Sequence, residues 1–133
     1  MLKDKIKMTG QEISILDNEN KLQYLIDLAK DVDVLDQKFK TDDNKIFGCA
    51  SNLWVVAEKS DGKIFYKHDA DAFITKGTAK IIVDIVNGEQ KTDIAELTLE
   101  SFKGLGIREL LTMQRQVGFA SLIEKIIRIA KYG

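Results

Sequence analysis

The amino-acid sequence has no proline, a single cysteine and a single histidine among its 133 residues. Without proline, turns must rest on glycine, asparagine and aspartate, and no cis-proline step can slow folding. One cysteine cannot form an internal disulfide or a cysteine-rich metal site, and this shortage is typical of proteins from a reducing compartment. The fold must therefore be specified by packing and by ordinary turns.

A strong net charge and a long apolar run are also absent from the sequence. The 20 basic and 21 acidic residues nearly cancel, to a net charge of -1, whereas nucleic-acid-binding proteins usually carry a clear basic excess. No segment approaches the roughly 18 consecutive apolar residues of a membrane span. The lysines of residues 1–7 are not followed by an apolar stretch, so we expect no signal peptide. We expect a cytoplasmic protein without nucleic-acid or membrane partners.

The composition is that of one folded domain. Apolar residues make up 44% of the chain and charged residues 31%, which is ordinary for a globular protein. A chain of this length can bury a real core, and it shows no internal repeat, low-complexity tract or linker. We therefore treat residues 1–133 as a single domain.

Helix signals occupy the first part of the chain. Thr9 and Glu12 fit a capping box, which predicts a short helix that begins there. Asp17 and Asn18 give a second start signal, and apolar residues at helical spacing continue to about residue 32. The charge-rich stretch 33–44 predicts a mostly irregular connection.

Strand signals follow in the middle of the chain. Residues 46–47 and 53–57 are apolar, and Asp61-Gly62 separates the second run from residues 64–66. An Asp-Gly pair between two apolar runs is the strongest short-range hairpin signal. The three runs predict a small antiparallel meander, with residue 49 in the turn between the first two strands.

Helix signals return in the second half. Asp69 or Asp71 can cap a helix that Asn87-Gly88 ends. Gly77 inside this helix costs stability, and close packing of another backbone against it would explain its presence. Further helices follow, the last of which opens at residues 112–115. Helices, a meander and more helices predict an α+β fold, with a small antiparallel sheet of about three strands packed against helices on one face.

The stretch 45–56 holds Cys49 in a setting that suits a reactive group. Gly48 precedes the cysteine and Ser51-Asn52 follow, so it lies in a loop of small residues rather than inside an apolar run. Reactive groups are often placed on loops over a rigid scaffold, and thiol exchange needs an accessible thiolate. Unpaired cysteines are nevertheless more often buried and inert. A reactive thiol and a non-catalytic binding module with a buried cysteine therefore both remain open.

His68 allows a third interpretation, a thiol enzyme in which Cys49 and His68 act with Asp69 or Asp71. An exposed histidine at a strand end is the simpler interpretation, because one cysteine and one histidine are weak grounds for a catalytic relay. A metal site is not expected, since no ligand spacing stands out. Arg115 lies near the start of the last helix, where the helix dipole disfavours a cation, so a partner-facing role is more attractive.

Three separated segments resemble motifs of one family. Residues 48–55 read Gly-Cys-Ala-Ser-Asn-Leu-Trp-Val and resemble Gly-Cys-Gln-Ser-x-Val-Trp. Residues 69–77 resemble Asp-Ser-Asp-Ala-x-Ile-Val-Lys-Gly, and residues 111–118 resemble Leu-Ser/Thr-Pro-Ser-Arg-x-x-Gly. These motifs are those of the SufE family, the sulfur-acceptor proteins of iron–sulfur cluster assembly. Ala50 stands where the family has Gln, and Met113-Gln114 stand where it has Pro-Ser.

The resemblance implies a sulfur-transfer role centred on Cys49. A cysteine desulfurase would pass sulfane sulfur to Cys49 by transpersulfidation, and the Cys49 persulfide would hand it to a cluster-assembly scaffold or another acceptor. Gly48, Ser51, Asp71 and Arg115 would support the loop or bind the partner, by motif match. No cofactor is implied for this chain, because pyridoxal phosphate belongs to the desulfurase.

The resemblance also implies a fold similar to that of the IscU-type scaffold. It implies stimulation of the desulfurase without independent turnover by this chain, so the chain is expected not to be an enzyme. A homodimer is left open as a further partner arrangement.

Overall fold

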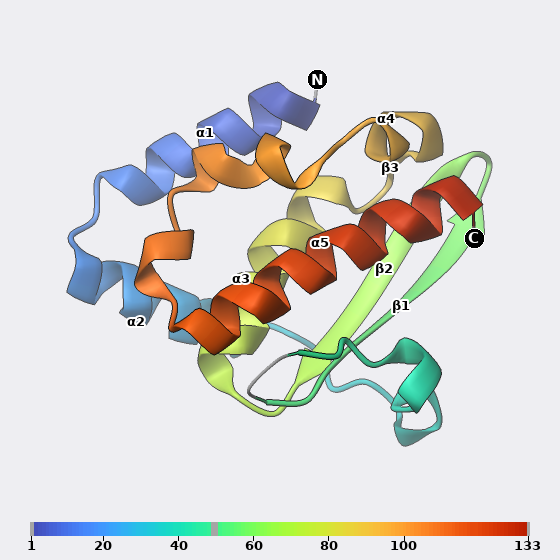
Figure 1. Cartoon of the computed structure of the whole chain (residues 1–133), viewed down its shortest axis with the longest axis horizontal. Helices are drawn as coiled ribbons and strands as arrows, with labels where there is room; N and C mark the ends of the chain where they lie inside the picture. The colour runs from blue at the N-terminus through green and yellow to red at the C-terminus, as the bar shows by residue number, and fades with distance from the viewer. Residues whose placement is uncertain (1, 49–50, 133) are drawn as a thin grey trace.

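The computed structural model describes residues 2–48 and 51–132. Its antiparallel sheet has the order β1-β2-β3, with β1 at Leu53–Ser60, β2 at Lys63–Ala70 and β3 at Glu89–Gln90. The helices around it are α1 (Leu2–Ser14), α2 (Asn18–Ala29), α3 (Phe73–Val86), α4 (Lys91–Ala95) and α5 (Met113–Tyr132) (Figure 1). Short 3-10 helices lie between them: η1 Gln37–Phe39, η2 Asp42–Asn44, η3 Leu99–Leu105 and η4 Arg108–Leu110. The predicted α+β class is confirmed.

The hairpin between β1 and β2 forms where the sequence predicts it. Ser60 pairs with Lys63, and the two residues between them, Asp61 and Gly62, have φ angles of 52° and 79°. Positive φ at both central residues is the geometry of a type I′ turn, which favours Asp-Gly. The turn sets the register of the whole hairpin, in which Leu53 pairs with Ala70 at the far end.

The third strand differs from the prediction. The segment at 46–47 makes only an isolated bridge, through Lys45 and Trp54, and a bond from the Ile46 amide to the Leu53 carbonyl. The third strand is instead β3, which pairs with Lys63 and Ile64 at the opposite edge. Two residues follow the bridge before the chain turns away at Gly48, so a full strand does not form.

The core lies between the sheet and the helices. Leu53 and Val55 of β1 and Ile64 and Tyr66 of β2 point to this side and are buried. The Tyr66 hydroxyl donates a 2.9 Å hydrogen bond to the Ile126 carbonyl of α5. In Figure 1 α5 passes in front of the strands, and α3 lies next to β2. No described helix combines the length and the apolar character that crossing a membrane requires.

Gly77 brings α2 and α3 into backbone contact, as its position inside a predicted helix suggested. A Cβ at Gly77 would overlap the backbone carbonyl of Leu25 in α2. Gly10 of α1 meets the carbonyl of Gly104 in the same way. In both places the absence of a side chain lets two segments pack more closely than any other residue would permit.

Several predicted helix starts are wrong. Thr9 does not cap a helix: α1 begins at Leu2, because buried Leu2, Ile6 and Ile13 form an apolar stripe that starts earlier. Neither Asp69 nor Asp71 caps α3, whose N-cap is Ala72 without a side-chain bond. Two predicted boundaries are confirmed: Asp17 caps α2 by accepting a hydrogen bond from the Asn20 amide at 2.8 Å, and Asn87 follows the last residue of α3. The predicted end of α2 is slightly late, because the helix ends at Ala29 rather than near residue 32.

Candidate functional site

Cys49 and Ala50, the centre of the sequence motif, lie outside the described residues. The segments before and after these two residues contact each other at residues 45–46 and 53–54. The Ile46 amide donates to the Leu53 carbonyl at 2.7 Å, and Lys45 bridges to Trp54. The chain therefore approaches the motif at residues 47–48 and continues from it at residues 51–52 beside the start of β1, and these two described segments are called the stems of the cysteine loop.

The N-terminal stem of this loop, Gly48, lies against α5. Gly48 has a φ of 91°, which favours glycine, and a Cβ there would come within 3.0 Å of Val117 Cγ1 and 3.8 Å of Ser121 Oγ. The sequence analysis named Gly48 as a loop residue, and the structure shows two separate reasons for glycine at this position. One is the backbone conformation, and the other is the nearness of α5.

The C-terminal stem is tied to the start of α3. The Ser51 hydroxyl donates to Thr75 Oγ1 at 3.2 Å, and the Asn52 side-chain amide donates to Asp71 Oδ2 at 2.7 Å. The Asp71 amide donates back to the Asn52 carbonyl at 3.1 Å. Asp71 is therefore a loop contact rather than a helix cap, and the sequence analysis did not single out its partners Asn52 and Thr75.

A small apolar pocket lies between α3 and α5 next to these stems. Arg115 is one of its lining residues, and the Arg115 Nε is buried without a hydrogen-bond partner among the described residues. The Arg115 amide is capped by Thr112 Oγ1 at 3.3 Å, at the start of α5. The lining residues are Leu53, Thr75, Thr78, Ala79, Leu111, Arg115, Gly118, Phe119 and Leu122.

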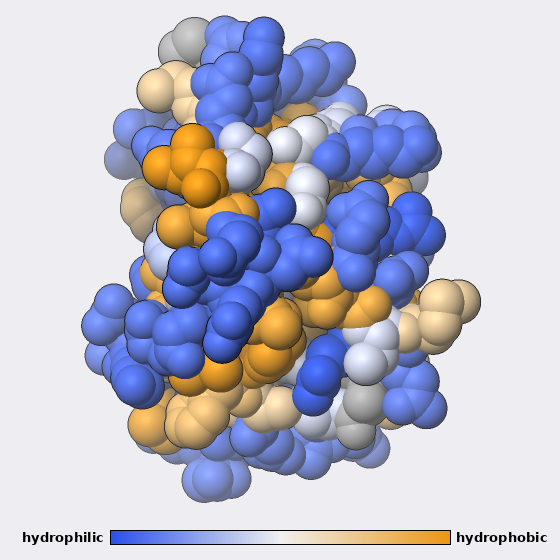
Figure 2. Space-filling model, turned by 90° about the vertical axis from the view of Figure 1, so that its left-hand side faces the viewer, coloured by the Kyte–Doolittle hydropathy of each residue, from blue (hydrophilic) through white to orange (hydrophobic). Residues whose placement is uncertain are grey.

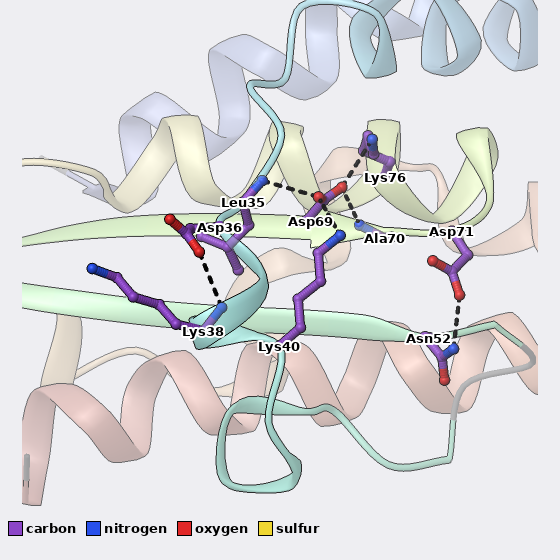
Figure 3. A network of polar contacts seen from close by, with 9 residues as sticks. All are labelled: Leu35, Asp36, Lys38, Lys40, Asn52, Asp69, Ala70, Asp71 and Lys76. Atoms are coloured by element: carbon purple, nitrogen blue, oxygen red, sulfur yellow. Dashed lines mark hydrogen bonds and ion pairs between the residues drawn. The ribbon is translucent and has the colours of Figure 1, made fainter.

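Asp69 is a buried carboxylate that joins three segments close to the site (Figure 3). It forms ion pairs with Lys76 of α3 at 2.9 Å and Lys40 at 3.2 Å, and it accepts a hydrogen bond from the Leu35 amide at 3.0 Å. Burial alone would raise the pKa of Asp69, but the bonds from Lys76, Leu35 and Lys40 outweigh it and lower the pKa to about 2. Lys40 also lies 5.1 Å from the centre of the Trp54 ring. This cluster fixes the connection 33–44 to the sheet.

His68 is buried, with 7% of its surface exposed, so the prediction of an exposed histidine is wrong. It pairs with Val55 and lines a hollow with Lys80 and Asp84, a hollow that none of the described loop residues 47–48 and 51–52 borders. Burial lowers its pKa to about 4, so the ring is neutral near pH 7. Its Nδ1 has no hydrogen-bond partner among the described residues, and the Asp69 carboxylate is directed to Lys40 and Lys76. Asp69 is therefore not paired with His68 as the carboxylate of a catalytic relay would be.

Within residues 2–48 and 51–132, no three histidine, aspartate or glutamate side chains come together in a group that could hold a metal ion.

Comparison with known proteins identifies a protein family that this chain matches. The family model described as SufE, an Fe-S metabolism associated domain, matches residues 7–130. An uncharacterized SufE-like protein of Rhizobium etli is 32% identical over 120 residues, covering 86% of this chain and 81% of its own. The sulfur acceptor protein CsdE of Escherichia coli is 31% identical over 117 residues, covering 85% and 78%.

A solved structure has the same fold. The solution structure of a hypothetical protein from Thermus thermophilus superimposes with a TM-score of 0.78 over 96% of this chain and 93% of that one. The two sequences share 19% identity, so this likeness concerns the fold alone.

Proposed function

The chain belongs to the SufE family of Fe-S metabolism associated domains, and from this membership we propose that it accepts sulfur on Cys49. The donor is a cysteine desulfurase, and the sulfur passes onward for iron–sulfur cluster assembly. The relative CsdE is named a sulfur acceptor protein, which supports the same role here.

One structural observation carries the proposal. The three motif segments, far apart in the sequence, meet around the residues on either side of Cys49. Gly48 lies against Val117 of α5, and the Ser51 hydroxyl is hydrogen-bonded to Thr75 of α3. Arg115 borders the pocket between these two helices. A purely structural cysteine would not require all three segments to converge on its loop.

The transfer is a thiol–persulfide exchange. The Cys49 thiolate attacks the outer sulfur of the desulfurase persulfide and forms a new S–S bond. The S–S bond of the donor breaks, and the donor cysteine leaves as a thiolate with the electron pair. Cys49 then carries the outer sulfur as its own persulfide, and a second exchange hands that sulfur to the downstream acceptor. Pyridoxal phosphate stays with the desulfurase throughout.

The surroundings of the loop suit a thiol that is alternately sheltered and presented. Ser51, Asn52 and Asp71 hold one stem with hydrogen bonds at the surface, which can break and reform without unfolding the core. Arg115 borders the pocket between α3 and α5, and its Nε has no hydrogen-bond partner among the described residues. We assign Ser51 and Asp71 to holding the loop, and Arg115 to contacting the loop or the partner.

The desulfurase is stimulated in this scheme because Cys49 removes the sulfur that occupies its cysteine. The chain itself completes no independent turnover. Cytoplasmic location and a homodimer stay predictions.

Mass spectrometry of the intact protein tests the proposal. After incubation with the cysteine desulfurase of the same organism and L-cysteine, the chain should gain one or more sulfur atoms, and dithiothreitol should remove them. Cys49→Ser should gain none, and a gain of sulfur by this variant would refute the assignment. His68→Gln should accept sulfur as wild type does, whereas a large loss would favour a thiol enzyme that uses His68.

A further inference from the structure

A hollow beside β2 takes no part in the proposed sulfur transfer. It has a volume of about 400 Å³, which lies in the range of roughly 300–1,000 Å³ that is typical of ligand sites. Residues 31–36 form one wall, β2 contributes residues 66–68, and the C-terminal half of α3 closes the remaining side. We call it the β2 hollow. None of the described residues of the loop stems borders it.

The edge of β2 along this hollow carries backbone groups that are not paired. In an antiparallel hairpin, alternate residues direct their amide and carbonyl groups away from the neighbouring strand. The Ile64 carbonyl accepts a hydrogen bond from the Gly88 amide at 2.7 Å, so Ile64 faces away from β1. The Tyr66 amide donates to Asn87 Oδ1 at 2.7 Å, so Tyr66 does the same, and His68 follows at the same spacing. In the part of the chain that the structure describes, the Tyr66 carbonyl and the amide and carbonyl of His68 have no hydrogen-bond partner.

The short strand β3 shows that this edge accepts a further strand. It pairs with Lys63 and Ile64, and the chain before it belongs to α3, so the ladder does not extend to residues 66–68. An open edge of this kind is a template for an extended segment, which gains affinity from main-chain hydrogen bonds. A segment added at Tyr66 and His68 therefore extends the third strand of the sheet.

The side chain of His68 gives the hollow a further unpaired group. Only 7% of His68 is exposed, and its Nδ1 has no hydrogen-bond partner among residues 2–48 and 51–132. Buried polar side-chain atoms are normally hydrogen-bonded, and a neutral imidazole nitrogen can donate or accept. An occupant of the hollow can therefore gain a side-chain bond as well as main-chain bonds at this position.

The charges of the lining favour a cationic occupant. Asp84 is paired with Lys80 at 2.9 Å, so these two charges offset each other. The other charged lining residues are Asp31, Asp33, Asp36 and Lys67. Three carboxylates are therefore set against one ammonium group, and Val34, which is 79% exposed, adds an apolar contact on the same wall.

The wall formed by residues 31–36 is fixed to the sheet. Figure 3 shows the connection 33–44 passing across β2, where the Leu35 amide donates to the Asp69 carboxylate at 3.0 Å. Figure 2 shows the side of the molecule on which α2 lies, just before this wall in the chain, and there hydrophilic side chains separate the apolar areas. A surface of this kind suits a partner that is recognised through polar groups.

We propose that the β2 hollow binds an extended, basic segment of a partner protein. The main chain of the segment pairs with the β2 edge at Tyr66 and His68, and its lysine or arginine side chains lie among the carboxylates of residues 31, 33 and 36. Charge complementarity selects a basic segment over an acidic one, because like charges oppose each other at a binding surface. Binding at this hollow does not require sulfur on Cys49, since the described loop stems do not border it.

Isothermal titration calorimetry at low salt tests the proposal with three capped hexapeptides. The first alternates lysine and valine, the second alternates glutamate and valine, and the third has the first sequence with every backbone amide N-methylated. The protein variant combines Asp31→Asn and Asp33→Asn, at exposed positions outside the helices and strands. The matched control combines Glu12→Gln and Glu124→Gln, which remove the same charge from exposed positions of α1 and α5.

Wild type should bind the lysine peptide at least about tenfold more tightly than the glutamate peptide or the N-methylated peptide, which cannot donate main-chain hydrogen bonds. The aspartate double variant should bind the lysine peptide about fivefold more weakly than wild type, and the control within about twofold of wild type. Hydrogen exchange of the His68 amide, followed by NMR, should slow about tenfold on binding, because that amide gains a partner.

Equal binding of the N-methylated and the unmodified lysine peptides would overturn the proposal, because main-chain pairing would then contribute nothing. Equal weakening in the two double variants would also overturn it, since only the net charge of the protein would matter. The proposal fails as well if the His68 amide exchanges at the same rate with the lysine peptide bound, or if wild type does not bind that peptide at about 1 mM.

Discussion

Asp69 connects β2 to α3 and to the connection 33–44, a role that the sequence does not indicate. The sequence marks it as a helix cap or a relay carboxylate, and the structure places it in a cluster with Lys40 and Lys76, with 4% of the side chain exposed. Neither lysine can be identified as its partner from spacing, because the contacts join β2 to α3 and to an irregular connection. The contacts of Asp69 could not be predicted from the sequence because they join segments that are distant in the chain, and they stabilise the fold for the same reason.

Replacing Asp69 by Asn should destabilise the protein strongly. The change keeps the shape but leaves two lysines, each 15% exposed, without their counter-ion. Removing one partner of a buried ion pair costs about 3 kcal/mol or more. Urea denaturation at pH 7 measures the free energy of unfolding.

Asp84→Asn is the matched control, because Asp84 pairs with Lys80 at 2.9 Å but is 55% exposed. An exposed pair of this kind is worth about 0.5 kcal/mol. Equal losses in the two variants would contradict the role given to the Asp69 cluster.

At the level of elements, local signals were reliable where the chain alone decides the conformation. The Asp61-Gly62 turn and the Asp17 cap fall where the sequence indicates them, because each depends on a few neighbouring residues. The third strand could not be placed, because the pairing of β3 with β2 depends on how α3 returns the chain to the sheet. In the candidate site, the motif residues could be named from the sequence alone, and their roles stay predictions. The contacts of Gly48 with α5 and of Ser51 with Thr75 could be identified only from the structure, because they join segments that are distant in the sequence.

Gly77→Ala should destabilise the protein although alanine is the better helix former. Helix propensity alone would favour alanine by about 1 kcal/mol. The added Cβ overlaps the Leu25 carbonyl, however, so α2 and α3 must separate, and we expect a net loss of roughly 2 kcal/mol or more.

Gly104→Ala is the control for this change, since a Cβ there would have its nearest neighbour, Ile6 Cγ2, at 3.8 Å. Thermal unfolding followed by circular dichroism should show a clear fall in melting temperature for Gly77→Ala and little change for Gly104→Ala. A stabilised Gly77→Ala would mean that α2 and α3 are not in contact through this position.

For the whole molecule, two buried groups set how stability depends on pH, in adjoining windows. His68 has a pKa lowered by burial to about 4, although Asp84 and Asp69 oppose that effect. As the pH falls from about 6.5, the unfolded state binds a proton that the folded state does not, so stability declines until about pH 4. Asp69 has its pKa lowered to about 2, so its contribution is present above about pH 4 and is lost as the pH falls toward 2.

The His68 window can be isolated with His68→Gln, which removes the titrating group. Wild type should lose about 2 kcal/mol of unfolding free energy between pH 7 and pH 5 from this residue. The variant should lose correspondingly less over the same range. Urea denaturation at pH 5, 6 and 7 provides the comparison, and parallel curves for the two proteins would show that His68 is not buried in its neutral form.

The two stems of the cysteine loop also bear on how far the sulfur of the proposed Cys49 persulfide could travel. Gly48 lies against α5 and Ser51 is hydrogen-bonded to Thr75 of α3, and only two residues separate Gly48 from Ser51 in the chain. Consecutive Cα atoms are about 3.8 Å apart, so a tether this short gives the segment a reach of only a few ångströms. Under the proposed function, the donor and the acceptor of the Cys49 sulfur would therefore each come to the same small area of surface and take turns there. Delivery to the acceptor would then follow departure of the desulfurase, which would order the two proposed exchanges in time.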